Sequence, residues 1–159
     1  MMAAVAQFSF VPVAEARELA GDLQDLFADL DATLPFEQRV YSGECHPSLD
    51  VVETQSGVEI VVDIAGVPAN AIRVLFRGDT VIVAGEKAPV TAPGEPTFHL
   101  VEREFGRFAR AVRLTGAFDV QHAHASLVAG ELTIVLPRIA DRRGQAHIIP
   151  VTSPADGRP

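Results

Sequence analysis

Two histidines with the spacing of metal ligands are the strongest sign of catalysis in the sequence. Residues 116–124 read GAFDVQHAH, so His122 and His124 are two positions apart. Side chains at positions i and i+2 of a β-strand point to the same face, where two imidazoles could bind one metal ion. The next carboxylate, Glu131, comes seven residues later beyond a predicted turn, and the only later histidine is His147 in the tail. Because this ligand set is incomplete, we expect no metal or other cofactor and interpret the pair as the solvent face of a strand. The inner face of that strand is predicted to carry Ala123, Ala125 and Leu127.

A run of four arginines is a second candidate, because it could contact the phosphates of a nucleic acid. Glu102 and Glu104 are interleaved with the run, and the whole chain has a formal net charge of -8. An acidic protein repels phosphate groups, and apart from Phe105 and Phe108 no aromatic platform for stacking bases accompanies the run. We therefore expect no nucleic acid partner and predict a solvated or ion-paired strand. The run consists of Arg103, Arg107, Arg110 and Arg113.

The single cysteine of the chain, Cys45, stands next to His46, as a thiol nucleophile and its base could. No oxyanion-stabilising or orienting group can be assigned from the sequence. One cysteine also supports neither an internal disulfide nor a multi-cysteine zinc site. No glycine loop of the kind that binds phosphates is present. We expect a structural cysteine and a protein that is not an enzyme.

Length and composition favour one globular domain made mainly of strands. The chain has 159 residues, of which 48% are hydrophobic and 21% charged, close to globular averages. Aromatic residues are few, so valine, isoleucine and leucine supply most of the apolar bulk. No apolar run is long enough to span a bilayer, and the first residues lack the basic segment of a signal peptide. We expect a cytoplasmic protein with no membrane partner.

An amphipathic helix is predicted over residues 14–30. Its acidic residues belong to a strongly charged segment, since residues 1–40 hold seven acidic and two basic side chains. Its apolar stripe has two interpretations: either it packs on the chain's own domain, or it is reserved for a partner. The stripe consists of Leu19, Leu23, Leu26, Phe27 and Leu30.

Beyond residue 57 the hydrophobic period changes from helical to two. Val58, Ile60, Val62 and Ile64 occupy alternate positions, and similar short runs follow at intervals separated by turn signals. Six to eight short strands in this pattern predict an all-β fold, an antiparallel immunoglobulin-like β-sandwich. The connection at residues 85–100 is long and rich in proline, as loops with a function often are. The further runs are residues 72–76, 80–84, 108–114, 123–127 and 132–136.

Five stretches of the sandwich carry specific text. They are PSLDVVET (47–54), DIAGV (63–67), VAGEK (83–87), VEREFGRFARAVRLT (101–115) and ASLVAGELTIVLPR (125–138). Together they resemble the alpha-crystallin domain of small heat-shock proteins over about residues 47–138. One departure is Ala129, at a position where asparagine is common in that family. The resemblance extends to the tail, where Ile149, Pro150 and Val151 match the family's motif of two aliphatic residues flanking one other.

The resemblance implies three parts of the chain and two assembly devices. The parts are a helical or disordered N-terminal arm at residues 1–46, the sandwich at 47–138, and a flexible C-terminal extension at 139–159. In the bacterial and plant branch of the family, the long loop carries a strand that is exchanged with a dimer partner. On this chain that strand would comprise Phe98, His99, Leu100 and Val101. The family's tail motif docks in a groove between the fourth and eighth strands. On this chain the resemblance suggests that the groove is lined by Val74, Phe76, Ala125 and Leu127.

The function implied by the resemblance is ATP-independent holding of partly unfolded proteins by a dynamic homo-oligomer. Its partners are then other copies of the chain and non-native client proteins. Binding such clients needs adaptable apolar surface kept soluble by charge, and the acidic N-terminal arm offers both. We expect client contact at Phe8, Phe10, Leu19, Leu23, Leu26, Phe27 and Leu30.

Two other classes of protein compete with this interpretation. A cupin-like metalloenzyme would need His122 and His124 to hold a metal, which metal analysis of the purified protein would reveal. A monomeric or dimeric sandwich acting as a co-chaperone or scaffold shares the strand pattern but needs neither the aliphatic tail nor the exchanged loop. A monomer on a sizing column would favour that second class.

Overall fold

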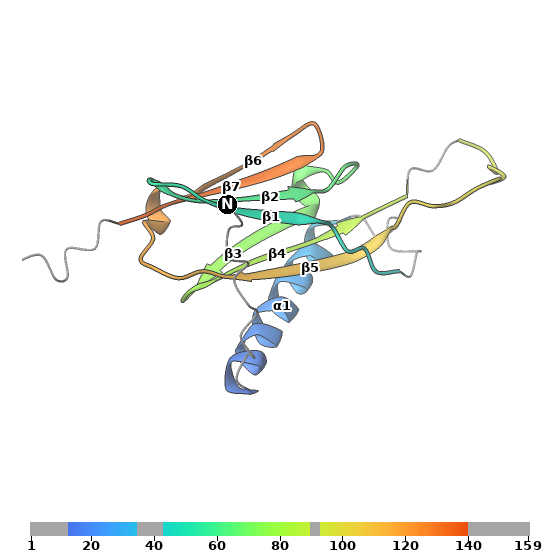
Figure 1. Ribbon diagram of the computed structural model, residues 1–159. Helices are drawn as coiled ribbons and strands as arrows, with labels where there is room; N and C mark the ends of the chain where they lie inside the picture. The colour runs from blue at the N-terminus through green and yellow to red at the C-terminus, as the bar shows by residue number, and fades with distance from the viewer. Residues whose placement is uncertain (1–12, 35–42, 90–92, 140–159) are drawn as a thin grey trace, which may run out of the picture.

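Alternating apolar residues build two antiparallel sheets that pack face to face. The structure is a computed structural model that describes residues 13–34, 43–89 and 93–139. Within these residues, one sheet has the strand order β1-β2-β7-β6 and the other the order β3-β4-β5 (Figure 1). This arrangement confirms the predicted all-β sandwich. The elements are α1 (Val13–Thr33), β1 (Leu49–Glu53), β2 (Gly57–Asp63), η2 (Ala69–Ala71), β3 (Ile72–Arg77), β4 (Thr80–Lys87), β5 (Gly106–Arg113), η3 (Val120–His122), β6 (His124–Val128) and β7 (Glu131–Pro137).

The core lies between the two sheets and follows the period of two. Val58, Ile60 and Val62 of β2 are buried, and each faces a buried residue of β7 across the strand pair. From the opposite sheet, Val81 and Val83 of β4 complete the centre of the same core. Burying each such side chain contributes about 1.5–3 kcal/mol. A slip of one residue would turn these side chains to the outside, so the pattern specifies the register.

The central strand β4 is buried on both of its faces. Ile82 and Ala84 point away from the core residues Val81 and Val83, yet their exposure is only 2% and 0%. The helix α1 covers this outer face: it contacts β3 and β4, and it lies against the three-stranded sheet in Figure 1. The apolar stripe of the helix therefore packs on the chain's own domain, which was the first of the two interpretations.

The prediction for the histidine pair was wrong in its local structure. His122 ends the 3-10 turn η3, and only His124 lies in a strand, at the start of β6. The backbone N–H of Ala123 donates to the carbonyl of Val120, a turn bond that replaces a ladder bond at this point. Of the three residues predicted for the inner face, Ala123 and Leu127 pack against the core. The third, Ala125, pairs with buried Ile134 but is exposed at the sheet edge.

The hairpin between β6 and β7 turns on Ala129 and Gly130, both with positive φ (53° and 83°). Two-residue hairpins of this kind favour asparagine followed by glycine. A Cβ at Gly130 would lie 2.8 Å from the Cα of Ala65, so glycine is required there. Ala129 is the non-glycine residue with positive φ among the described residues, and the left-handed conformation costs it about 1–2 kcal/mol.

Candidate functional site

The two histidines lie in different elements, His122 in η3 and His124 in β6. His122 is exposed at the end of η3, and its Nδ1 lies 2.6 Å from Oδ2 of Asp119. This hydrogen bond holds the pKa of Asp119 below its usual value. The described residues contain no group of three histidine, cysteine, aspartate or glutamate side chains placed to hold a metal ion. In the part of the chain that the structure covers, nothing supports the metalloenzyme interpretation.

Cys45 is buried beside β5, where its backbone N–H donates to the carbonyl of Arg107 at 3.0 Å. Burial raises the pKa of the Cys45 thiol, because desolvation disfavours the thiolate. A reactive cysteine needs the opposite shift. The site is consistent with a structural cysteine.

Three of the four arginines in the predicted run make ion pairs or hydrogen bonds within the chain. Arg113 pairs with Asp79 at 2.7 Å and holds the pKa of that carboxyl below its usual value. Arg110 donates to the carbonyl of Pro47 at 2.7 Å, which ties β5 to the segment before β1. Arg107 pairs with Asp31 of α1. The prediction of an ion-paired strand therefore holds for Arg107 and Arg113 of β5, whereas Arg103 lies before the strand.

The four residues predicted for the tail groove lie on strands at the edges of the two sheets. Val74 and Phe76 are on β3, Ala125 and Leu127 on β6, and all four pair with core residues, so they point toward the inside of the sandwich. Val74 is 37% exposed, so the edge is not closed. The ring of Phe76 meets Phe118 edge to face, with centroids 6.3 Å apart. Since Phe118 lies just before η3 and β6, these two edges lie on the same side of the sandwich.

The predicted exchange segment projects from the molecule without belonging to a strand. Phe98, Leu100 and Val101 are 65%, 74% and 61% exposed. The connection that carries them extends beyond the ends of the two sheets in Figure 1. The same residues line a shallow hollow of about 110 Å³ together with Pro89 and Phe105. Contiguous exposed apolar side chains of this kind are typical of interaction surfaces.

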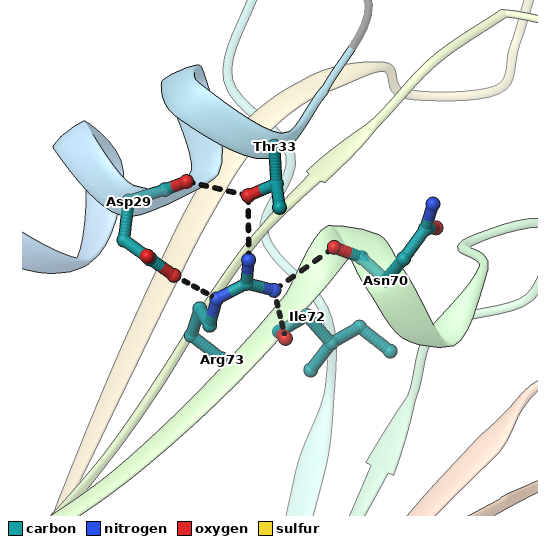
Figure 2. A network of polar contacts seen from close by, with 5 residues as sticks. All are labelled: Asp29, Thr33, Asn70, Ile72 and Arg73. Carbon is teal, nitrogen blue, oxygen red and sulfur yellow. Dashed lines mark hydrogen bonds and ion pairs between the residues drawn. The ribbon is translucent and has the colours of Figure 1, made fainter.

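An unpredicted polar contact fastens α1 to the three-stranded sheet. Arg73 of β3 forms an ion pair with Asp29 and donates to Oγ1 of Thr33 at 2.7 Å (Figure 2). It also donates to the carbonyls of Asn70 and Ile72, each at 2.9 Å. The last turn of α1 has no basic residue of its own, so Arg73 supplies the positive charge that the C-terminus of a helix favours.

Two further contacts flank the helix. Asp22 is 6% exposed and pairs with Arg77 of β3 at 2.5 Å. On the opposite side Arg107 of β5 pairs with Asp31, and its guanidinium lies 5.0 Å from the ring centroid of Phe27. The sequence carried one signal of this site: residues 81–84 form an uninterrupted apolar run, which is typical of a strand covered on both faces.

The structure places the residues predicted to contact clients partly in this helix–sheet contact. Leu30 is fully buried, at 0% exposure. The other stripe residues in α1 are half-buried: Leu19, Leu23, Leu26 and Phe27. Phe8 and Phe10 lie outside the described residues, as do the tail residues Ile149, Pro150 and Val151.

Comparison with known proteins identifies the family. A family model described as Hsp20/alpha crystallin family matches residues 50–152. The chain therefore belongs to the small heat-shock proteins, a family of ATP-independent chaperones, and is not an enzyme. No helix in the described part of the chain has the length and apolar character that crossing a membrane requires.

Individual relatives agree with this assignment, and a solved structure agrees with the fold. The 18.9 kDa heat shock protein of Oryza sativa subsp. japonica is 35% identical over 107 residues, which are 67% of this chain but only 60% of that protein. Heat shock protein 16 of Schizosaccharomyces pombe is 28% identical over 79% of this chain and 90% of its own length. The fold is similar to a small heat-shock protein from Xylella fastidiosa, with a TM-score of 0.58 at 24% identity over 67% of this chain and 96% of that one.

Proposed function

We propose that this chain is an ATP-independent holdase that binds partly unfolded proteins and prevents their aggregation, as a dynamic homo-oligomer of strand-exchanged dimers. The observation that carries the proposal is the extent of the family match. It begins within β1 and continues past β7 to residue 152, so it includes Ile149 and Val151. A match limited to the sandwich would support the fold, whereas one that includes the tail also supports the assembly device.

In the proposed dimer, residues 98–101 of each copy add a strand to the other copy. The exposed strand β1 is the receiving edge, because it borders the four-stranded sheet and leaves Val51 and Val52 45% and 48% exposed. An unpaired edge strand is a template for another strand. Phe98 and Leu100 then share one face of the added strand and lose the exposure that they have in the single chain. Two such contacts related by a two-fold axis close the dimer.

Larger assembly uses the tail and the groove between β3 and β6. Burial of Ile149 and Val151 gains on the order of 3–6 kcal/mol before ordering costs, so one docking event is weak. Tethering within an oligomer raises the effective concentration to about millimolar, and many weak contacts then hold an assembly that still exchanges subunits. Pro150 fixes φ between the two aliphatic residues, which lowers the entropy lost on docking.

Clients are proposed to bind first at the N-terminal arm, through Phe8, Phe10 and the stripe of α1, whose fully buried Leu30 becomes accessible only when the helix leaves the sheet. The acidic side chains of the same arm keep the complexes soluble. The lone, buried Cys45 agrees with the cytoplasmic location that we propose.

A heat-aggregation assay tests the proposed function. A thermolabile client is heated with increasing amounts of the full chain, without nucleotide, and light scattering is followed. We expect scattering to fall to near baseline at a few chains per client, with no further effect of ATP. Serum albumin at equal mass is the control. Scattering that the chain leaves unchanged, or lowers only with ATP, would contradict the proposal.

A further inference from the structure

The outer face of the β3-β4-β5 sheet has the composition of a binding site for a helix. Its centre is apolar, with Ile82 and Ala84 of β4 exposed by only 2% and 0% under α1. Its borders are basic: Arg73 and Arg77 stand on β3 at one side and Arg107 on β5 at the other. A helix that fits this face needs an apolar stripe with acidic residues on both flanks.

The helix α1 meets that description through contacts on both flanks. Asp22 and Asp29 pair with the β3 arginines, Asp31 pairs with Arg107, and Leu30 is fully buried. Arg107 is shared, since its Nε also lies 3.5 Å from the buried carboxylate of Glu86. Most of the stability of an amphipathic helix in a protein comes from the packing of its apolar face, so the order of α1 depends on docking.

We propose that this face is an exchangeable helix-binding site, which α1 occupies in its own chain and which the α1 of a second copy can occupy instead. The complementarity lies in the sequence shared by all copies, so a second copy presents the same stripe and the same three aspartates. Occupancy within one chain benefits from an effective concentration of about millimolar. Exchange between copies therefore becomes important in a crowded assembly, or when the helix of the receiving chain has been released.

Release of α1 uncovers two apolar surfaces at once: the stripe of the helix and the face of the sheet. If clients bind these surfaces, the aspartate–arginine pairs set how much binding surface the chain displays. That consequence rests on the proposed holdase function, whereas helix exchange itself does not.

The chain offers a matched pair of variants for the docking contact. Asp22→Lys with Asp29→Lys places two positive charges against Arg77 and Arg73. Glu18→Lys with Asp25→Lys makes the same charge change on the same helix, at two exposed residues that form no ion pair within the described part of the chain. Neither variant substitutes a residue of the β-sandwich.

Amide hydrogen exchange of the full chain reports docking, because a released α1 loses its helical protection. We expect at least tenfold faster exchange at residues 19–33 in Asp22→Lys/Asp29→Lys, and a change of less than twofold in Glu18→Lys/Asp25→Lys. Asp22→Lys combined with Arg77→Glu restores a pair of opposite charges and should return part of the protection. Strands β2 and β7 serve as the internal check of folding. Equal exchange in both lysine variants overturns the electrostatic part of the proposal.

A labelled peptide of residues 13–34 tests exchange between copies. Fluorescence anisotropy should show at least tenfold tighter binding to full-length Asp22→Lys/Asp29→Lys, whose site is vacated, than to the wild-type chain, whose site is occupied. Binding should weaken in 0.5 M salt and be lost when the peptide carries the same two lysines. If the variant fails to fold, excess peptide should instead speed the exchange of α1 in the wild-type chain. The face accepts only its own helix if the peptide binds the vacated chain no more tightly than the occupied chain. The same conclusion follows if excess peptide does not speed the amide exchange of α1 in the wild-type chain. A positive result with a failed aggregation assay would leave the helix site valid and reject only the holdase function.

Discussion

Blocking the groove between β3 and β6 should dissociate the oligomer without unfolding the chain. We choose Ala125→Glu, because Ala125 points toward the inner side of edge strand β6 but is exposed in the single chain. Ser126→Glu is the matched control: it makes the same charge change one residue later, on the opposite face of the same strand, where Ser126 is also exposed.

The expected free-energy changes predict that both variants fold and that only Ala125→Glu prevents docking of the tail. A substitution at an exposed position changes the free energy of unfolding by about 0.5 kcal/mol or less, so both variants should fold. A docked tail gains on the order of 3–6 kcal/mol from Ile149 and Val151 before ordering costs. An unpaired carboxylate enclosed in that contact costs about 3–5 kcal/mol, which is enough to abolish docking.

Light scattering coupled to size-exclusion chromatography measures the result. We expect the mass of Ala125→Glu to fall toward that of a dimer, and the mass of Ser126→Glu to equal that of the wild type. Ile149→Ala with Val151→Ala should also lower the mass to that of a dimer, because these residues form the other side of the same contact. If Ala125→Glu retains the full mass while melting at the wild-type temperature, the tail does not dock in this groove and the reasoning is refuted.

Three further changes test other parts of the account. Ala129→Asn should raise the free energy of unfolding by about 1 kcal/mol, because asparagine tolerates the left-handed conformation, and thermal melts should show Ala129→Val shifted the other way. Burial raises the pKa of Cys45 above the value of 9.0 for a free thiol, so the folded state binds its proton more tightly and stability is lost as the pH rises past that value. Cys45→Ala should therefore flatten the decline of denaturant-measured stability above pH 9.0, and an unchanged decline would assign it to other groups. Replacing Phe98, Leu100 and Val101 by serine should yield folded monomers in sedimentation experiments, whereas intact dimers would place the dimer contact elsewhere.

The sandwich could be predicted because its signal is local and repeated. Val58, Ile60 and Val62 must alternate wherever one face of a strand is buried, and the six predicted runs correspond to β2 through β7. The stripe of α1 was visible for the same reason, at the helical period. The surface on which the stripe packs could not be predicted, since the ion pair of Asp29 with Arg73 joins residues 44 positions apart.

The candidate site was predictable only in part, because its residues acquire their surroundings from strand pairing. The environment of Ala125 depends on its position at the edge of a sheet, which no local pattern specifies. His122 was misplaced because a 3-10 turn after Asp119 interrupts an apparently alternating stretch. The segment at residues 98–101 has an extended character in the sequence, but a strand needs a neighbour to pair with, and the described residues of the single chain provide none for it.

The most direct test of the holdase function is to recover the client after heating. The full chain and a thermolabile client are heated together without nucleotide, centrifuged, and separated by size-exclusion chromatography. A holdase keeps the client in the supernatant, and the client then elutes with the chain in soluble complexes of high mass. Client found in the pellet at every ratio, or kept soluble only when ATP is added, would contradict the holdase function.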